Sequence, residues 1–313
     1  MDEHGSSARY DLKTVLAFAA IYIVWGSTFF AIRILVQTVP VFVAAGLRFA
    51  IAGLLLYAWI RLRGGTGLNS VEWRNAFALG FLLFLIPYGG LFWAEKTLPS
   101  GVASVLVATI PLWTVFLEAI VFKAHRLHTM QVLAIALGFA GVAVVATGGD
   151  RSGRRFALLP CLALVGSTIS WSFGTVVSKQ LKLPVSKAMS SGAQMLAGGG
   201  LLLLVSALLN EFRPAPHLNG PAGLALFYLI TAGSIAGFTA YMWLLGRMPA
   251  TTVASYAYVN PVVALLLGHL FGGEAISSQT LWGSAVIVAS VVLLLRVQAM
   301  RSAPMSANVS VRT

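Results

Sequence analysis

The sequence predicts an all-α integral membrane protein with ten transmembrane helices, arranged as two inverted five-helix repeats around a central cavity. Three observations lead to this prediction. The chain is 58% hydrophobic and only 10% charged, whereas about a quarter of the residues of soluble domains are charged. Ten apolar runs are long enough to cross a hydrocarbon core of ~30 Å. Motifs of the first half also recur in the second half at a nearly constant offset, as in many membrane carriers.

Short polar connections separate the apolar runs. The runs cover residues 14–35, 40–60, 76–94, 100–122, 129–149, 156–178, 188–209, 222–245, 250–271 and 279–296. The chain therefore divides into an N-terminal segment (1–13), a first repeat (14–149), a connecting loop (150–155), a second repeat (156–296) and a tail (297–313). The N-terminus lacks a cleavable-signal pattern, so we interpret the first run as a retained span. The short polar tail is expected to be disordered.

The net charge of +12 indicates a membrane orientation and no nucleic-acid partner, because the basic residues lie beside the apolar runs. With ten spans and a cytoplasmic N-terminus, fourteen of the 21 Lys and Arg residues lie inside and five outside, and Arg33 and Arg48 fall within spans. Under the positive-inside rule this predicts a multi-pass membrane protein with both termini in the cytoplasm. The loop 150–155, with three arginines, is the exception.

Duplicated motifs relate the two halves. Trp25 in the first run matches Trp171 in the sixth at an offset of 146, and Pro99 matches Pro249 at an offset of 150. Because each repeat holds an odd number of spans, the halves are expected to cross the membrane in opposite senses.

A second proline falls inside each of two matched runs, Pro111 in the fourth and Pro261 in the ninth. Proline lacks the backbone donor that continues a helix, so both residues are predicted to break their helices.

Arg48 is the strongest single indication of a binding site, since it lies inside the second apolar run. Burial of arginine in hydrocarbon is costly, so the side chain should face a cavity or a partner. It either binds an anionic or carboxylate-bearing substrate or is anchored to a helix carbonyl or to Glu95. Its repeat mate, Gln194, is polar and neutral, which predicts a cavity with one charged and one uncharged wall.

Aromatic and polar residues are expected to complete a substrate site. The candidates are Trp25, Trp171, Tyr88, Tyr256, Tyr258 and Asn260. The last three lie just before Pro261, where a broken helix exposes polar backbone that their side chains can satisfy or share with a substrate.

The acidic residues avoid the middle of the apolar runs. Glu118, near the end of the fourth run, is the candidate for coupling transport to protons, and its alternative role is that of a helix-end partner.

Motifs of enzymes and of metal sites are missing from the sequence. It has no nucleophile elbow, no phosphate-binding glycine loop before a lysine and no His-Glu-x-x-His pair. Cys161 is the single cysteine, which excludes an intramolecular disulfide and a cysteine metal cluster. We therefore expect no enzymatic activity, no cofactor and no metal.

Together these motifs resemble the EamA family of the drug/metabolite transporter superfamily, and within it the YedA-like inner-membrane members. The motifs are residues 25–28, 46–49, 99–103, 111, 169–171 and 254–261. The resemblance implies a ten-helix inverted-repeat carrier whose cavity is built from spans one to four and six to nine. The family includes exporters of amino acids, metabolites and toxic compounds. The chain departs from the pattern at 123–126, where an acidic residue is common, whereas the second repeat keeps Glu274.

The expected function is therefore secondary transport of a small organic metabolite, amino acid or drug-like compound, outward, by alternating access through a midplane cavity. The partners are this small molecule and the lipid bilayer. A monomer is favoured, although no sequence feature determines the oligomeric state. The alternatives are a non-transporting membrane sensor or assembly subunit and a passive channel.

Overall fold

The computed structural model describes residues 11–123, 126–149, 155–184, 186–245, 247–248 and 250–302. Within these residues the regular elements are helices, apart from an isolated bridge between Gly149 and Arg155. Nine helical segments of the described chain are long and apolar enough to cross a membrane, and Tyr256–Gly272 is a shorter apolar helix. For the described residues, the prediction of an all-α membrane protein with many apolar spans is therefore confirmed.

The described helices follow one another as spans, several of which are built from more than one helical piece. The first half contains α1 (Leu12–Ala19), η1 (Ala20–Val24), α2 (Trp25–Leu35), α3 (Val41–Leu62), α4 (Ser70–Gly80), η2 (Phe81–Leu85), α5 (Ile86–Ala94), α6 (Ser100–Val107), α7 (Ile110–Ile120) and α8 (Thr129–Ala146). The second half contains α9 (Leu158–Ser178), α10 (Lys187–Leu208), α11 (Gly220–Tyr228), η3 (Leu229–Ala236), α12 (Gly237–Leu245), α13 (Ala250–Val253), α14 (Tyr256–Gly272) and α15 (Ser278–Ser302).

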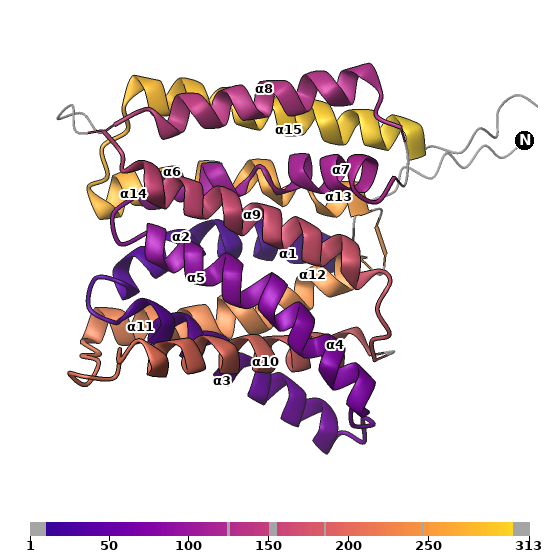
Figure 1. Ribbon diagram of the computed structural model, residues 1–313, viewed down its shortest axis with the longest axis vertical. Coiled ribbons are helices and arrows are strands. Elements are labelled where there is room, and N and C mark those ends of the chain that lie inside the picture. Colours follow the sequence, from indigo (N-terminus) through magenta and orange to yellow (C-terminus); the bar gives the residue numbers. More distant parts are fainter. Residues whose placement is uncertain are drawn as a thin grey trace, which may run out of the picture.

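The helices lie side by side across the longest axis of the molecule (Figure 1). Helices α8 and α15 form one edge, and α3 packs against α10 at the other edge. The α3–α10 contact depends on small residues: a Cβ atom on Gly199 would lie 2.2 Å from the backbone nitrogen of Ala50. In lipid, where apolar side chains gain little from leaving the solvent, such close backbone approach supplies the packing between helices.

Large apolar side chains cover the outer faces of several helices. Leu54, Leu133, Leu204 and Leu266 are each about half exposed. In a water-soluble protein such apolar surface would cause association, whereas hydrocarbon solvates it without cost. The exposed apolar faces therefore agree with a lipid environment.

At one end of the molecule, carboxylates of the second half cap helices of the first half. Glu211 accepts hydrogen bonds from the amides of Phe42 (2.9 Å) and Val43 (3.0 Å) in the first turn of α3. Glu274 accepts from Ser100 N at 2.8 Å in the first turn of α6. A carboxylate at a helix N-terminus pairs with unsatisfied donors and with the positive end of the helix dipole. We call the end that holds Glu95, Glu211 and Glu274 the acidic end.

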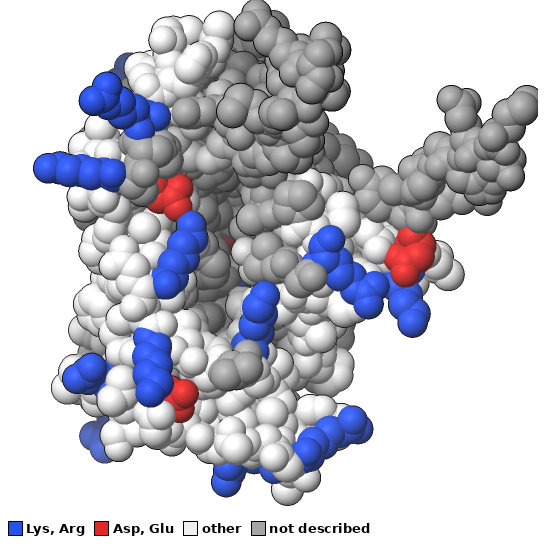
Figure 2. Space-filling view, turned by 90° about the vertical axis from the view of Figure 1, so that its right-hand side faces the viewer, with Lys and Arg blue, Asp and Glu red and all other residues white. Residues whose placement is uncertain are grey.

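Basic side chains gather at the opposite end, where α3 and α9 finish and α4 and α10 begin (Figure 2). We call this end, with Arg61, Arg63, Arg74, Lys179, Lys182 and Lys187, the basic end.

One of the two proline breaks occurs where the sequence predicts it. Pro111 lies in the first turn of α7, after a break at residues 108–109. For Pro261 the prediction is wrong: it lies inside α14, and the break between α13 and α14 falls at residues 254–255. A proline in the first helical turn loses no hydrogen bond, but one deeper in a helix leaves a carbonyl that must be accommodated.

The C-terminal tail also starts later than expected. Helix α15 continues to Ser302, so residues 297–302 are helical and not disordered. Residues 1–10 of the N-terminal segment, 150–154 of the connecting loop, Pro249 and the tail from 303 onward lie outside the described residues.

Candidate functional site

A cavity of about 110 Å³ lies between the two halves and takes its walls from both. Its lining contains one arginine, several aromatic rings and a few small polar side chains. The residues are Trp25, Thr28, Phe29, Arg48, Phe49, Phe84, Pro87, Tyr88, Leu91, Val107, Ile110, Ser167, Thr168, Trp171, Met195, Gly233, Ser234, Phe238, Tyr256 and Asn260. This composition, apolar walls with few polar groups, is typical of small-molecule sites.

Arg48 of α3 is the single charged residue in this lining. The side chain is only 3% exposed, and its Nε donates to Ser234 Oγ at 3.0 Å. Nη1 is buried and has no hydrogen-bond partner in the structure. An unpaired buried donor costs free energy. A hydrogen bond from Nη1 to an anionic group that enters the cavity would remove this cost.

Two aromatic rings support the guanidinium of Arg48. Its central carbon lies 4.7 Å from the ring centroid of Phe49 and 5.3 Å from that of Tyr88. Such cation–π contacts stabilise a positive charge where water is absent. On another side, a Cβ atom on Gly233 would lie 3.4 Å from Nη2 and 2.9 Å from Thr28 Cγ2. Glycine at 233 therefore leaves room for the Thr28 methyl group beside the guanidinium.

Aromatic rings form two groups around the cavity. In one, Tyr88 meets Phe49 at 4.3 Å and Trp171 at 5.9 Å between ring centroids. In the other, Trp25 meets Tyr256 at 5.1 Å in an edge-on arrangement. Trp25 Nε1 donates to the carbonyl of Gly233 at 3.0 Å, which fixes its ring against η3. The cavity thus offers flat apolar surfaces next to one cation.

Asn260 links α14 to the first span. When its amide nitrogen faces the three surrounding carbonyl oxygens, it donates to Tyr22 O at 3.1 Å, Ile21 O at 3.2 Å and Tyr256 O at 3.3 Å. Ile21 and Tyr22 belong to η1, whose wider turn displaces carbonyls from the regular helical pattern. Asn260 therefore has a structural task as well as a place in the cavity wall.

Two of the candidate residues lie away from the cavity. Gln194 of α10 donates from Nε2 to Ser190 Oγ at 2.8 Å and is absent from the lining. Tyr258 lines a second, more open hollow beside α1 and α15, together with Phe18 and Tyr22. The other candidates, Trp25, Arg48, Tyr88, Trp171, Tyr256 and Asn260, all line the central cavity.

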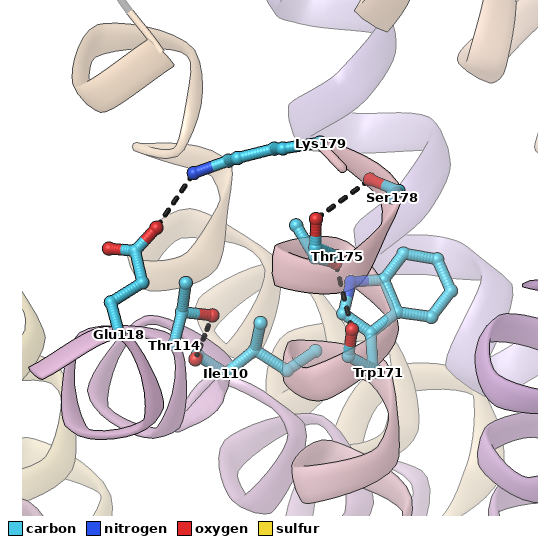
Figure 3. A network of polar contacts seen from close by, with 7 residues as sticks. All are labelled: Ile110, Thr114, Glu118, Trp171, Thr175, Ser178 and Lys179. Atoms are coloured by element: carbon cyan, nitrogen blue, oxygen red, sulfur yellow. Dashed lines mark hydrogen bonds and ion pairs between the residues drawn. The ribbon is translucent and has the colours of Figure 1, made fainter. Parts of the chain in front are cut away.

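Glu118 lies at the basic end and not beside the cavity (Figure 3). Its Oε1 pairs with Lys179 Nζ at 2.7 Å, and the lysine side chain is 63% exposed. In Figure 3 the Thr114, Thr175 and Ser178 hydroxyls bond carbonyls of their own helices, so among the residues drawn only the Lys179–Glu118 pair connects the end of α9 to α7. Such an exposed ion pair is typical of a helix-end partner.

Sequence reasoning missed several polar residues that line the cavity. It also missed the π-helical segments that help to place lining residues there. Ser167 and Thr168 lie one turn before Trp171 on α9, which is a signal that could have been used. Ser234, the partner of Arg48, lies in η3, and Phe84 lies in η2. A π-helical segment changes the angular position of its side chains around the helix axis, and here it turns them toward the cavity. No residue pattern in the sequence predicts these segments.

Comparison with known proteins identifies the family. The model of the EamA-like transporter family matches residues 12–147 and again 158–296. The chain is 41% identical to the uncharacterized inner membrane transporter YedA of Escherichia coli over 89% of each chain. It is 26% identical to a probable amino-acid metabolite efflux pump of Salmonella typhimurium, over 86% of this chain and 90% of that one.

A solved crystal structure shares the fold, with a TM-score of 0.62 at 22% identity over 91% of this chain and 98% of the other. The double family match, the close relative and the apolar spans agree. The chain belongs to the EamA-like transporter family and is a multi-pass inner-membrane transporter of a small molecule.

Proposed function

We propose that this transporter is a ten-span secondary carrier that exports a small organic carboxylate, such as an amino acid or another acidic metabolite, through the central cavity. The observation that carries the proposal is Arg48, whose buried Nη1 has no partner and lies in a lining shared by both halves. A guanidinium with a free donor suits a carboxylate, and the aromatic rings suit an apolar substrate body.

The arrangement of two inverted repeats is part of this proposal. The family model matches the chain twice, and α13 with α14 supplies a broken tenth span in addition to the nine long apolar segments of the described chain. The gathering of Lys and Arg at the basic end supports placing that end, and both termini, in the cytoplasm (Figure 2). Alternating access then opens the cavity toward the basic end and the acidic end in turn.

The outward direction is supported by the relative named a probable amino-acid metabolite efflux pump. Membership of a transporter family removes the alternative of a non-transporting sensor or assembly subunit. A passive channel differs from a carrier in its kinetics, since a channel shows neither saturation nor acceleration by substrate on the opposite side.

Counterflow in proteoliposomes tests the proposal. Radiolabelled amino acids and organic acids are offered to vesicles preloaded with the same unlabelled compound. The carrier should show saturable counterflow of at least one carboxylate. Arg48→Ala should lower its kcat/KM by about tenfold to a hundredfold, the loss expected for a charge-assisted hydrogen bond. Arg48→Lys should restore only part of it, because lysine cannot form the paired contact.

Arg61→Ala is the matched control, since Arg61 is exposed at the basic end and bonds only the nearby Gly65 carbonyl. This variant should transport normally, and all variants should elute and melt like the wild type. Undiminished saturable flux in Arg48→Ala would remove Arg48 from the substrate site. Flux that does not saturate would show that the protein is a passive channel and not a carrier.

A further inference from the structure

A second ionisable group is buried without partners, at the acidic end. Glu95 follows the last residue of α5 and is 0% exposed, and neither carboxylate oxygen has a hydrogen-bond partner in the structure. An ionised carboxylate in such a place would lose its hydration and gain no donor in return. The geometry therefore favours the neutral, protonated form.

The neighbours of Glu95 reinforce this preference. The Glu274 carboxylate accepts hydrogen bonds from three donors: Ser100 N at 2.8 Å, Ser100 Oγ at 3.0 Å and Gly101 N at 3.3 Å. The negative charge of Glu274 disfavours a second negative charge on Glu95. Arg33 of α2 does not form an ion pair with the Glu95 carboxylate, because its guanidinium donates to the backbone carbonyl of Glu95 instead.

The charged groups that act on Glu95 are Glu274, Arg33 and Arg48. Glu95 lies just beyond the span that ends at Ala94. Burial first, and then the negative charge of Glu274, raise the pKa of Glu95 well above its usual range, against the smaller opposing effects of Arg33 and Arg48. The direction agrees with the missing hydrogen-bond donors.

Position connects this carboxyl group to the closure of the acidic end. Leu91, four residues before Glu95 on α5, lines the central cavity. At the same end, the bonds of Glu274 to the first turn of α6 join the segment after α14 to the first half. If the acidic end opens during transport, these contacts separate and water reaches Glu95.

We propose that Glu95 is a proton-binding site of the transport cycle: it holds a proton while the acidic end is closed and loses it when that end opens. The opening step rests on the alternating access proposed above. The pKa of Glu95 is higher in the closed state than in the open state, so protonation of Glu95 stabilises the closed state relative to the open one. This stabilisation is complete below the ordinary glutamate pKa and declines as the pH rises above it.

Distance measurements between spin labels test the proposal without a substrate. Thr97→Cys and Ser278→Cys place labels at exposed sites on either side of the acidic end, in a Cys161→Ala background in lipid nanodiscs. As the pH rises above about 4.5, the ordinary value for glutamate, the ratio of long to short distances should increase. The increase should approach but not exceed about tenfold per pH unit, the limit for one proton.

Glu95→Gln, which imitates the protonated form, should keep the short distance at every pH. Glu95→Asp should keep a pH response with a shifted midpoint, which also guards against a misfolded glutamine variant. Glu118→Gln is the matched control: its carboxylate pairs with Lys179 at the basic end, so the wild-type response should remain.

Three results would overturn the proposal: distances that do not change with pH, an unchanged response in Glu95→Gln, or a response to sodium at constant pH that exceeds the response to protons. The last result would assign the site to a metal cation. Because no substrate is present, failure here is separate from failure of carboxylate transport.

Discussion

The two interrupted helices, α6–α7 in the first half and α13–α14 in the second, begin with similar sequences and break at different places relative to their prolines. Pro111 and Pro261 are 150 residues apart, whereas the breaks at 108–109 and 254–255 are 146 apart. The first piece, α6, has 8 residues, and its counterpart α13 has only 4. Pro111 therefore begins a helix, and Pro261 lies within one.

Hydroxyl groups occupy corresponding positions at the two breaks. Thr109 Oγ1 donates to Leu106 O at 2.6 Å, and Ser255 Oγ donates to Thr252 O at 2.6 Å. Each break also meets a hydroxyl from a helix of the other half. Ser172 of α9 reaches the break before α7, and Tyr22 of η1 reaches the break before α14. In a membrane, where water cannot satisfy an interrupted backbone, these side chains decide where a helix can break.

Asn260→Ala should have the largest effect, because the second break has a polar bridge that the first lacks. The variant leaves the carbonyls of Ile21, Tyr22 and Tyr256 without the amide donor. The free energy of unfolding should fall by about 2 kcal/mol, the cost of unpaired buried polar groups. Thermal unfolding in detergent measures this free energy.

Thr114→Ala is the control, because it loses only a bond to Ile110 in its own helix. It should change the free energy of unfolding by less than about 0.5 kcal/mol. Equal effects would argue against the bridge.

Replacement of the two prolines should sharpen the comparison. Pro261→Ala restores a backbone donor inside α14 and should raise the free energy of unfolding by about 1 kcal/mol, below the full ~3 kcal/mol cost of proline in a helix. Pro111→Ala should change it by less than about 0.5 kcal/mol, because no donor is needed in the first turn. Detergent melts of both variants provide the measurement. A larger effect at Pro111 than at Pro261 would contradict the assigned breaks.

Removal of the facing hydroxyls should have a smaller effect than Asn260→Ala or Pro261→Ala. Ser172→Ala removes a 3.0 Å bond to Ile110 O, and Tyr22→Phe removes a 2.5 Å contact with Ser255 Oγ. Each should lower the free energy of unfolding by about 0.6 kcal/mol, the average for side-chain hydrogen bonds between membrane helices. Chemical unfolding in mixed micelles resolves differences of this size. Markedly unequal losses would show that the two breaks are not stabilised in the same way.

Arg48 and its partner show how much of the candidate site was predictable. An arginine inside an apolar run must find a cavity or a partner, so its importance could be predicted from sequence. Its actual partner, Ser234, could not, because the two residues are 186 positions apart and meet only through the packing of α3 against η3. Gln194 occupies the repeat-related position, yet it bonds Ser190 and lies outside the cavity lining.

Glu95 and Glu118 show the same limit of sequence-based prediction for acidic residues. Both are glutamates near the end of an apolar run, and position in the sequence favoured Glu118 for proton coupling. The structure buries Glu95 without a partner and pairs Glu118 with Lys179. Burial and partners come from neighbouring helices, so a single run of sequence cannot distinguish the two residues.

By itself, the sequence determined the membrane-spanning helical class, the repeated motifs, the break before Pro111 and the aromatic and basic character of the cavity. Composition and periodicity are sufficient there, because the bilayer excludes unpaired backbone and most charges. Only the tertiary structure decided where the second break falls, which polar residues meet Arg48 and which carboxylate is buried. These features depend on π-helical phase shifts and on contacts between distant helices, whose energies are set by the whole assembled bundle.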